Sequence, residues 1–476
     1  MPTQQQKNQH LLRRAGFGPA ASQWDDVQRR STAELWSALK KDSAAAPTYL
    51  NVLDEELLST FRSPALLRGY DEAGRKRVAA KNRVALRDIN LRWLREMSES
   101  RAQLREKMAF FWHGHFPTYT LNINNAQLLL HVLRTHALGN FRTLLTQVSQ
   151  SAAMMLYLNA QQNRKGHPNE NFAREVMELF TLGRGNYTEK DIQEAARAFT
   201  GWRVEADGSF GFKDSEHDGS SKTIFGKTGA WKGEDVLGFL LDRRETAVHL
   251  TRKLYKFLVS DTPSEPRVQQ LADVFYKSGY EISALLDAIF TAPWFYETEL
   301  LGARIKSPIE LLAGIRRTIP LTLENEEYYL LLQRVLGQTL FYPPNVAGWP
   351  GGRTWIDSTT LPARMRLPGL LREVSAGAAS GDGPVNVVNT VFSNAKPRPL
   401  GKGTVINTRI DWTAHLKRFD GVKREDLTAA ISESLLAIPL QVPASLVTGS
   451  ADAGTRESFL RTATLQVMAL PEYQLC

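Results

Sequence analysis

Apolar residues recur every three or four positions along most of this chain, with polar residues between them. The segments with this pattern are 22–41, 76–111, 122–138, 140–157, 233–242, 244–259, 265–278, 281–291, 425–438 and 457–470. Such spacing places the apolar side chains on one face of a helix. The pattern therefore predicts a mainly α fold, a multi-helix globular bundle.

Helix-capping signals mark where two further helices begin. Thr188 is a good N-cap residue, and Asp191 follows three positions later. In KSPIELLAGI, Ser307 is the expected N-cap, Pro308 takes the first helical position and Glu310 the third. Capping alone accounts for these polar residues, so we assign them no chemistry.

The helical pattern stops after Gly201. The segment WRVEADGSFGF alternates around Asp207 and Gly208, a dipeptide typical of tight hairpin turns. We therefore expect a small β-hairpin insertion near 202–213.

Two later segments also lack helical periodicity. Residues 341–365 form a long loop rich in Pro, Gly and Trp, and residues 374–408 are rich in Gly, Ser, Pro and Asn. We expect a main helical domain at 1–373, which includes the hairpin and the Trp-rich loop. A linker or excursion at 374–408 would follow, and then a C-terminal helical segment at 409–476 packed on the main domain.

The composition is that of a globular protein. Of 476 residues, 42% are hydrophobic and 23% are charged, enough apolar surface for a sizeable core. The net charge of +9 favours anionic partners. The positive charge is spread along the chain and no nucleic-acid-binding module is recognisable, so nucleic acid is a disfavoured partner.

The sole cysteine is Cys476, which excludes an intrachain disulfide and a thiolate zinc site within one chain. No stretch approaches 18 uninterrupted apolar residues, so we expect no transmembrane segment. The N-terminus lacks the apolar core of a signal peptide. That fits a cytoplasmic protein, or a periplasmic or secreted one if a signal has been removed.

The stretch HPNENFAREVMELF, residues 167–180, carries the densest set of polar residues. As a helix it places Asn171, Glu175 and Glu178 on one side, at spacings of four and then three residues. Two carboxylates so placed could bind a hard cation or share a proton, with Arg174 neutralising one of them. A solvated helix face with one ion pair is the alternative.

A second candidate is FFWHGHF, residues 110–116. His113 and His115 could chelate a metal if the backbone is extended, because residues i and i+2 then share a face. The helical run is expected to end at about Trp112, with Gly114 able to break it. The alternative is a helix C-terminus whose histidines interact with free carbonyls.

Two polar loops complete the candidates. His217 and Asp218 follow the hairpin directly, on a loop that could carry functional residues or be merely solvated. In the Trp-rich loop, Trp349 and Trp355 combine flat apolar faces with the polar groups of Asn345 and Arg353. Such a mixture suits a sugar-like ligand and equally suits a loop pinned to the core by its tryptophans.

Several catalytic motifs are missing. The chain has no Gly-rich phosphate loop, no HExxH, no GxSxG elbow and no dinucleotide fingerprint. An acyl-enzyme mechanism therefore has no support. If the protein is an enzyme, a metal site or carboxylate acid–base chemistry is the better hypothesis.

Taken in order, six strings resemble the bacterial family known as domain of unknown function 1800. They are HLLRRAGFGP, FWHGHF, NRKGHPNENFAREVMELFTLGRGNYTEKDIQEAARAFTGW, KSPIELL, LGQTLFYPPNVAGWPGGRTWI and ALPEYQLC. The resemblance spans His10 to Cys476. It implies that the family signature is matched here by Asn169, Glu170, Asn171, Arg174, Glu175, His217, Asp218, Asn345, Gly348, Trp349, Pro350 and Trp355.

The resemblance also implies a partner and an export route. Members of this family are often encoded beside proteins similar to sulfatases and alkaline phosphatases, and some carry export signals. The signature is polar where capping and core packing do not require it. We therefore expect the 113–115, 167–178, 217–218 and 345–357 segments to form a shared functional site.

Two hypotheses follow from these residues. In the first, the protein is a metal-dependent, hydrolase-like enzyme acting on an anionic or carbohydrate-like substrate, with a divalent cation as cofactor. His113, His115 and Glu178 would bind the metal, and the catalytic residues would be Glu175, His217 and Asp218. The substrate-binding residues would be His167, Asn169, Glu170, Asn171, Arg174, Asn345, Trp349, Arg353 and Trp355. In the second, the protein is a non-catalytic binding or assembly partner of the phosphatase-like protein.

Overall fold

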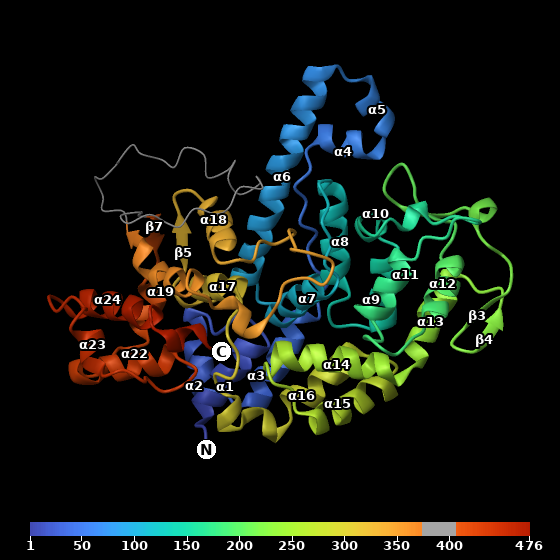
Figure 1. Cartoon of the computed structure of the whole chain (residues 1–476). Coiled ribbons are helices and arrows are strands. Elements are labelled where there is room, and N and C mark those ends of the chain that lie inside the picture. Colours follow the sequence, from blue (N-terminus) through green and yellow to red (C-terminus); the bar gives the residue numbers. More distant parts are fainter. Residues whose placement is uncertain (374–405) are drawn as a thin grey trace.

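A computed structural model describes residues 1–373 and 406–476 and confirms the mainly α fold. The first third of the chain is helical. Its helices are α1 (Gln4–Arg14), α2 (Trp24–Arg29), α3 (Thr32–Ser43), α4 (Glu55–Arg62), α5 (Pro64–Gly69), α6 (Glu72–Glu99), α7 (Gln103–His115), α8 (Ile123–Thr135), α9 (Phe141–Ser149) and α10 (Ala152–Tyr157). In Figure 1, α4, α5 and the outer part of α6 project as an arm from the rest of the molecule.

The prediction of one continuous helix over 76–111 is wrong, because the segment forms parts of two helices. Helix α6 ends at Glu99, and α7 begins four residues later, at Gln103. The side-chain amide of Gln103 donates to the carbonyls of Met97 (3.0 Å) and Ser100 (2.8 Å). These carbonyls lie at the end of α6, where intrahelical partners are lacking, so the amide stabilises the break.

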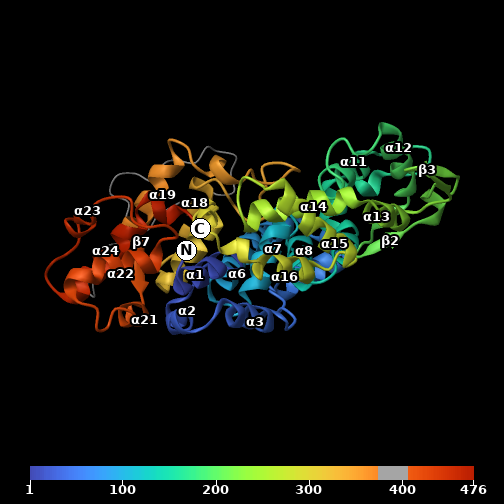
Figure 2. The ribbon, with the colours of Figure 1, turned by 90° about the horizontal axis from the view of Figure 1, so that it is seen from below.

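The middle of the chain confirms the expected helices closely. They are α11 (Asn171–Glu178), α12 (Glu189–Ala198), α13 (Gly233–Asp242), α14 (Arg244–Leu258), α15 (Glu265–Lys277), α16 (Ile282–Phe290) and α17 (Pro308–Thr318). The predicted N-caps of α12 and α17, Thr188 and Ser307, both accept from the backbone of the third helical residue. Helices α14 and α15 lie side by side in both views of the ribbon (Figures 1 and 2).

The predicted hairpin is confirmed as β1 (Trp202–Val204) paired antiparallel with β2 (Phe210–Phe212). A second hairpin, β3 (Lys222–Ile224) with β4 (Lys227–Gly229), was not expected. It lies in a segment rich in Gly, Ser and Lys that gives no alternation of apolar and polar residues. Contacts with α12, rather than its own pattern, position this hairpin.

A small mixed sheet was also not expected. Its order is β5-β7-β6, where β7 (Ile406–Ile410) pairs antiparallel with β5 (Leu321–Leu323) and parallel with β6 (Leu371–Glu373). Most of the expected linker, 374–405, lies outside the described residues. Its last three residues, 406–408, belong to β7.

The C-terminal segment is helical, as expected. Its helices are α21 (Thr413–Lys417), α22 (Leu427–Leu435), α23 (Ala444–Thr448) and α24 (Arg456–Met468). Helices α18 (Tyr328–Val335) and α19 (Thr360–Leu370) precede this segment. Helix α1 is bonded to α22, since Gln9 donates to the carbonyl of Glu433 (3.0 Å) and Arg13 to that of Leu435 (3.0 Å). The two chain ends therefore meet at one side of the molecule (Figures 1 and 2).

Helix α7 crosses the core and carries two charged residues that are fully buried. Glu106 accepts from Arg134 (2.9 Å) and from the indole of Trp93 (3.1 Å). Its neighbour Lys107 points to a different helix and pairs with Glu310 of α17. No helix among residues 1–373 and 406–476 is long and apolar enough to span a membrane.

Candidate functional site

The segment before α11 is shaped by asparagine side chains. The buried Asn163 donates to the carbonyl of Ala196 (2.7 Å) and accepts from the backbone of Asn169 (2.9 Å). Asn169 accepts in turn from the backbone of Asn171 (3.0 Å), and Asn171 donates to the carbonyl of Leu158 (3.0 Å). These amides fix the entry into α11, while His167 next to them is exposed.

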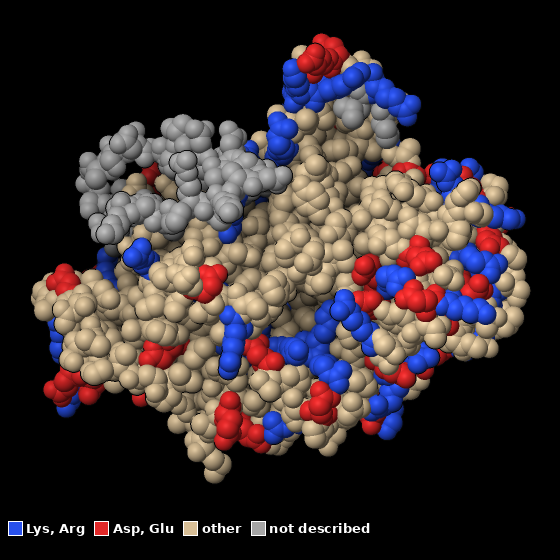
Figure 3. Space-filling view, in the orientation of Figure 1, with Lys and Arg blue, Asp and Glu red and all other residues tan. Residues whose placement is uncertain are grey.

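The first turn of α11 carries a surface ion-pair network. Arg174 contacts Glu170 (3.1 Å) and Glu189 of α12 (2.7 Å). All three side chains are at least one third exposed, so each pair stabilises the fold by less than about 1 kcal/mol. In Figure 3, acidic and basic side chains alternate over the α11–α13 side of the molecule. Arg174 thus pairs with Glu170 and Glu189, and not with Glu175 or Glu178, the two carboxylates that the sequence suggested it could neutralise.

Further along α11, two carboxylates have opposite environments. The half-buried carboxylate of Glu175 has no hydrogen bond or ion pair with any described residue. Burial raises the pKa of Glu175, and the charge of Glu178 adds to the rise. Glu178 accepts from the phenol of Tyr187 (2.6 Å) and pairs with Arg184, and these contacts hold the pKa of Glu178 below its usual value.

Side-chain nitrogen atoms contact the backbone carbonyls of the residues that follow α11. His249 and Lys253, four residues apart on one face of α14, contact the carbonyl of Leu179 at 3.3 and 3.4 Å. His115 donates from Nε2 to the carbonyl of Phe180 (3.2 Å). Burial lowers the pKa of His249 to about 4 and that of Lys253 to about 8. Gly183 is required here, because a Cβ on it would lie 2.7 Å from His249 Nδ1.

A pocket of about 500 Å³ opens beside this end of α11. Its polar lining residues are Arg184, Asn186, Arg244, Glu245, His249, Arg252 and Gln269. Each lining arginine pairs with an acid: Arg184 with Glu178 (2.5 Å), Arg244 with Asp273 (2.7 Å) and Arg252 with Glu265 (2.7 Å). Lys and Arg also gather over α14 in the middle of the face drawn in Figure 3. The polar lining of the pocket is thus suited to a polar ligand.

His113 faces the Trp-rich loop instead. Its Nε2 accepts from the backbone N–H of Phe341 (3.1 Å), and its ring packs on Trp93 and Trp349. Burial lowers the pKa of His113 to about 3, so the ring is neutral. The loop approaches closely at Gly348 (φ +83°), where a Cβ would lie 2.6 Å from the carbonyl oxygen of Gly114.

The other loop residues are divided between core and surface. Trp355 is buried at 6% exposure and anchors the loop, whereas Trp349 is half-buried. Asn345 is exposed and accepts from the backbone of Ala347 (2.9 Å), which shapes a turn, and Arg353 is exposed. The burial of Trp355 agrees with the alternative interpretation, in which tryptophans pin the loop to the core.

The structure does not assemble the expected metal ligands, His113, His115 and Glu178. Helix α7 runs to His115 and does not end at Trp112, so the two imidazoles diverge by about 200° on the helix. One meets the Trp-rich loop and the other meets Phe180. Within residues 1–373 and 406–476, no three His, Cys, Asp or Glu side chains form a group that could hold a metal ion.

His217 and Asp218 lie beyond the other end of α11, beside α12. Asp218 pairs with Arg197 (2.7 Å) and accepts from the backbone of Ser220, and these contacts outweigh burial and hold the pKa of Asp218 well below its usual value. His217 is buried and contacts the carbonyl of Thr200 through Nδ1 (2.9 Å). The neighbouring Glu216 accepts from the backbone of Lys165 (2.8 Å), which joins this loop to the segment before α11.

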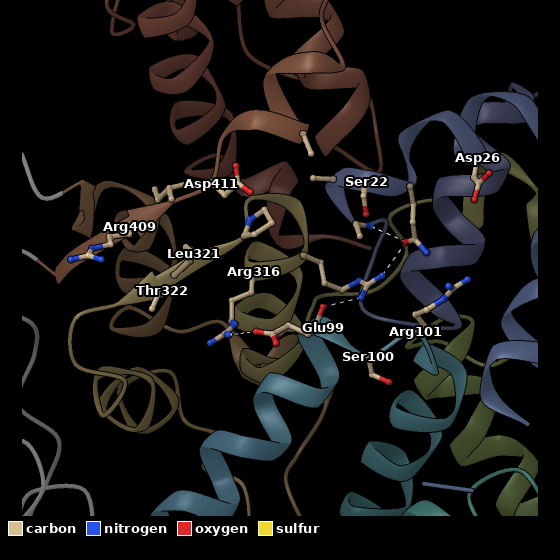
Figure 4. A pocket seen from close by; sticks show the side chains of 18 residues that line it. Ser22, Asp26, Glu99, Ser100, Arg101, Arg316, Leu321, Thr322, Arg409 and Asp411 are labelled. Atoms are coloured by element: carbon tan, nitrogen blue, oxygen red, sulfur yellow. Dashed lines mark hydrogen bonds and ion pairs between the residues drawn. The ribbon is translucent and has the colours of Figure 1, made fainter. Parts of the chain in front are cut away.

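A larger cavity, of about 820 Å³, lies between the end of α6, α17 and the β5–β7 pair (Figure 4). Its two buried arginines are already engaged. Arg316 pairs with Glu99 (2.7 Å), and Arg317 donates to the carbonyls of Gly18 and Ser98 and to the side chain of Gln23. These contacts hold the walls together and leave those guanidinium groups little free capacity for a ligand.

Several residues of this region were missed from the sequence. Tyr187 was treated as part of a helix start, although it donates to Glu178. His249 and Lys253 looked like ordinary members of an amphipathic helix. Their spacing of four residues was the available signal, because it places two nitrogen groups on one face.

A family model described as "Protein of unknown function (DUF1800)" matches residues 10–475, nearly the whole chain. Comparison with curated proteins and with solved structures gave no match. The family match includes α11, the Trp-rich loop and the His217–Asp218 loop. The chain belongs to the DUF1800 family of proteins of unknown function.

Proposed function

We propose that this protein is a hydrolase-like enzyme in which Glu175 transfers a proton to or from a polar substrate. One observation carries the proposal: Glu175 is a half-buried carboxyl group with no partner among the described residues. Folded proteins usually pair such a group, because burying a charge without a partner is costly. An unpaired one is free to exchange a proton with a substrate.

The contrast with Glu178 supports acid–base chemistry. The pKa of Glu175 is raised and that of Glu178 is lowered. Two nearby carboxyl groups with pKa values moved apart are the usual arrangement for one acid and one ionised carboxylate. In this proposal Glu175 acts as the acid, and Glu178 stays ionised through Tyr187 and Arg184.

The adjacent pocket suggests the substrate class. Arg184 lines the pocket and also pairs with Glu178, so this arginine joins the pocket to the end of α11. Arginine and amide side chains favour an anionic, carbohydrate-like substrate. Arg174 and Glu170 border the same helix, whereas His217 and Asp218 lie toward its other end. A divalent metal ion is given no step, because the described residues offer it no set of three ligands.

The test compares Glu175→Gln with Glu189→Gln on a panel of sulfated, phosphorylated and uronic-acid glycosides carrying a chromogenic leaving group. Glu175→Gln keeps the shape of the side chain and removes its acidity, so turnover should fall by about 10²- to 10⁴-fold. Glu189→Gln removes only an exposed ion pair and should keep full turnover. Equal turnover by the wild type and Glu175→Gln would contradict the proposal, as would a Glu175 pKa that NMR places at the ordinary value.

The alternative is that the protein is an assembly partner of a phosphatase-like protein. It is favoured by large apolar side chains exposed in and beside α8 and α10, namely Tyr119 (42%), Leu121 (62%), Leu128 (40%) and Leu156 (38%). Exposed apolar groups that lie close together mark interaction surfaces. Co-expression and co-purification with such a protein, lost on Leu121→Ser with Leu128→Ser, would support this alternative.

A further inference from the structure

The end of α10 lies against the first turn of α11. Asn171 donates from its side-chain amide to the carbonyl of Leu158, the residue that follows α10 (3.0 Å). Asn171 and Glu175 are four residues apart and therefore share one face of α11. This face is turned toward the end of α10, where Tyr157 is the last helical residue.

Tyr157 adds a phenol to the surroundings of Glu175. The Tyr157 side chain is half-buried, and its hydroxyl has no hydrogen-bond partner among the described residues. Burial raises the pKa of Tyr157, and the charge of Glu175 adds to the rise. The phenol and the carboxyl group are thus close enough to interact electrostatically, yet no hydrogen bond joins them. Both groups are free to bond the atoms of a ligand.

Asn171 supplies an acceptor on the same face of α11. Its side-chain nitrogen is engaged with Leu158, but its side-chain oxygen, Oδ1, has no partner in the described part of the chain. The Asn171 side chain is exposed, and those of Tyr157 and Glu175 are partly exposed, so a ligand can reach all three from solvent. These three side chains form an open polar cluster, which we call the α10–α11 cluster.

The α10–α11 cluster is uncharged when Glu175 is protonated, the state in which Glu175 acts as an acid. The phenol and the protonated carboxyl group donate hydrogen bonds, and Asn171 Oδ1 accepts them. Neighbouring hydroxyl groups of a sugar ring match this set, because each hydroxyl both donates and accepts. An ionised phosphate or sulfate group only accepts, so it would oppose the lone pairs of Asn171. The ring of Tyr157 also offers a flat face to a sugar.

We propose that Tyr157 and Asn171 bind neighbouring hydroxyl groups of a sugar ring and hold that ring beside the carboxyl group of Glu175. The phenol of Tyr157 donates to one hydroxyl, and the next hydroxyl donates to Asn171 Oδ1. The inference rests on the function proposed for Glu175 and specifies its substrate as a glycoside rather than a simple phosphate or sulfate ester. Tyr157 and Asn171 act in binding only, and neither makes or breaks a covalent bond.

Binding is tested without turnover in the full-length Glu175→Gln variant, with methyl glucuronide and methyl phosphate as probes. Tyrosine carrying an NMR label at Cζ reports each phenol, and the signal of Tyr157 is identified by its absence from a Tyr157→Phe sample. Methyl glucuronide should move the Tyr157 signal saturably and leave that of Tyr119, an exposed tyrosine outside the cluster, in place. No saturable shift with methyl glucuronide, or an equal shift with methyl phosphate, would overturn the inference.

Kinetics on the glycoside panel separate this inference from the proposed function. Tyr157→Phe should raise KM about tenfold and change kcat less than about twofold, because a binding contact acts on substrate and transition state alike. Tyr119→Phe makes the same substitution at a side chain that is 42% exposed, and its KM should match the wild type. Turnover that needs Glu175 but shows an unchanged KM in Tyr157→Phe would overturn the inference alone. Saturable binding at Tyr157 without any turnover would instead overturn the proposed function and support the binding cluster.

Discussion

Two groups of ionised side chains in this molecule differ in how completely they are paired. In the core, Glu310 is 4% exposed and forms ion pairs with Lys107 and Arg304 (3.4 Å). It also accepts a hydrogen bond from the backbone N–H of Ser307 (2.8 Å). On α11, Glu178 is paired, but Glu175 one turn earlier has no partner among the described residues. In the core group the carboxylate of Glu310 is paired, whereas on α11 the carboxyl group of Glu175 has no partner among the described residues.

This difference separates a structural role from a chemical one. Burial acts to raise the pKa of Glu310, but Lys107 and Arg304 outweigh it, so the pKa lies well below its usual value and the carboxylate stays ionised. Nothing offsets burial so fully at Glu175, so the pKa of Glu175 is raised, by burial first and then by the charge of Glu178. Complete pairing should therefore show up in stability, and incomplete pairing in reactivity and pH dependence.

The largest effect on stability should come from Glu310→Gln. The substitution keeps the contact with Ser307 but leaves Lys107 buried without its ion-pair partner, while Arg304 keeps Asp261 (4.0 Å). Breaking one side of a buried ion pair costs about 3–5 kcal/mol in the free energy of unfolding. Urea denaturation monitored by tryptophan fluorescence measures this loss.

A double variant tests whether pairing is the cause. Lys107→Met combined with Glu310→Gln removes both charges, so the combined cost should be clearly smaller than the sum of the two single costs. Glu99→Gln is the exposed control, because the Glu99 side chain is 61% exposed where it meets Arg316, and it should cost less than about 1 kcal/mol. Additive costs at 107 and 310 would show that the core group is not coupled.

The next largest loss of stability is expected from His113, a buried residue whose Nε2 already accepts a hydrogen bond. His113→Phe keeps an aromatic ring between Trp93 and Trp349 but removes the acceptor for the backbone N–H of Phe341. A buried N–H without a partner costs about 1–3 kcal/mol. The pKa of about 3 keeps His113 neutral, so the loss should be the same at pH 6 and pH 8 in thermal melts. A loss that grows on acidification would contradict this.

The sequence predicted the helices well because their apolar spacing is local information. Residues 233–242 and 265–278 were placed within one residue of their bounds. It could not predict the β5-β7-β6 sheet, whose strands are three to five residues long. Strand β7 pairs with β5 across 85 to 89 positions of sequence and with β6 across 35. Short strands carry too few residues for alternation to be visible, and their pairing depends on the tertiary fold.

The candidate site was predicted only where local helix spacing determines it. The common face of Glu175 and Glu178 follows from helix periodicity. The divergence of His113 and His115 was missed because the helix end was placed three residues too early, and element ends are the least certain part of such predictions. Glu310 was explained by capping alone, since only the fold brings Lys107 to it from 203 residues away.

A smaller effect is expected from Tyr187→Phe. The phenol donates to Glu178, and this bond is the largest contribution that lowers the pKa of Glu178. Its loss should reduce the free energy of unfolding by about 1 kcal/mol and move the pKa of Glu178 upward. Tyr157→Phe is the control, because the pKa of Tyr157 responds to the charge of Glu175 without a hydrogen bond to it. Equal effects of the two variants would mean that the hydrogen bond to Glu178 adds nothing to the general effect of removing a phenol hydroxyl.

The smallest effect on stability, and the most specific, is expected from Glu175→Gln. Because the folded state raises the pKa of Glu175, it binds the proton more tightly than the unfolded chain does. The resulting stabilisation is complete below the unfolded pKa of about 4.3 and is lost as pH rises through the folded value. Glu175→Gln should therefore be more stable than the wild type at pH 7.5, by a small margin because the side chain is partly exposed, with the gap closing toward pH 4. Melting curves of both proteins at pH 4.5 and 7.5 decide this. A variant less stable than the wild type at pH 7.5 would mean that Glu175 has a stabilising partner, and the contrast with Glu178 would then fail.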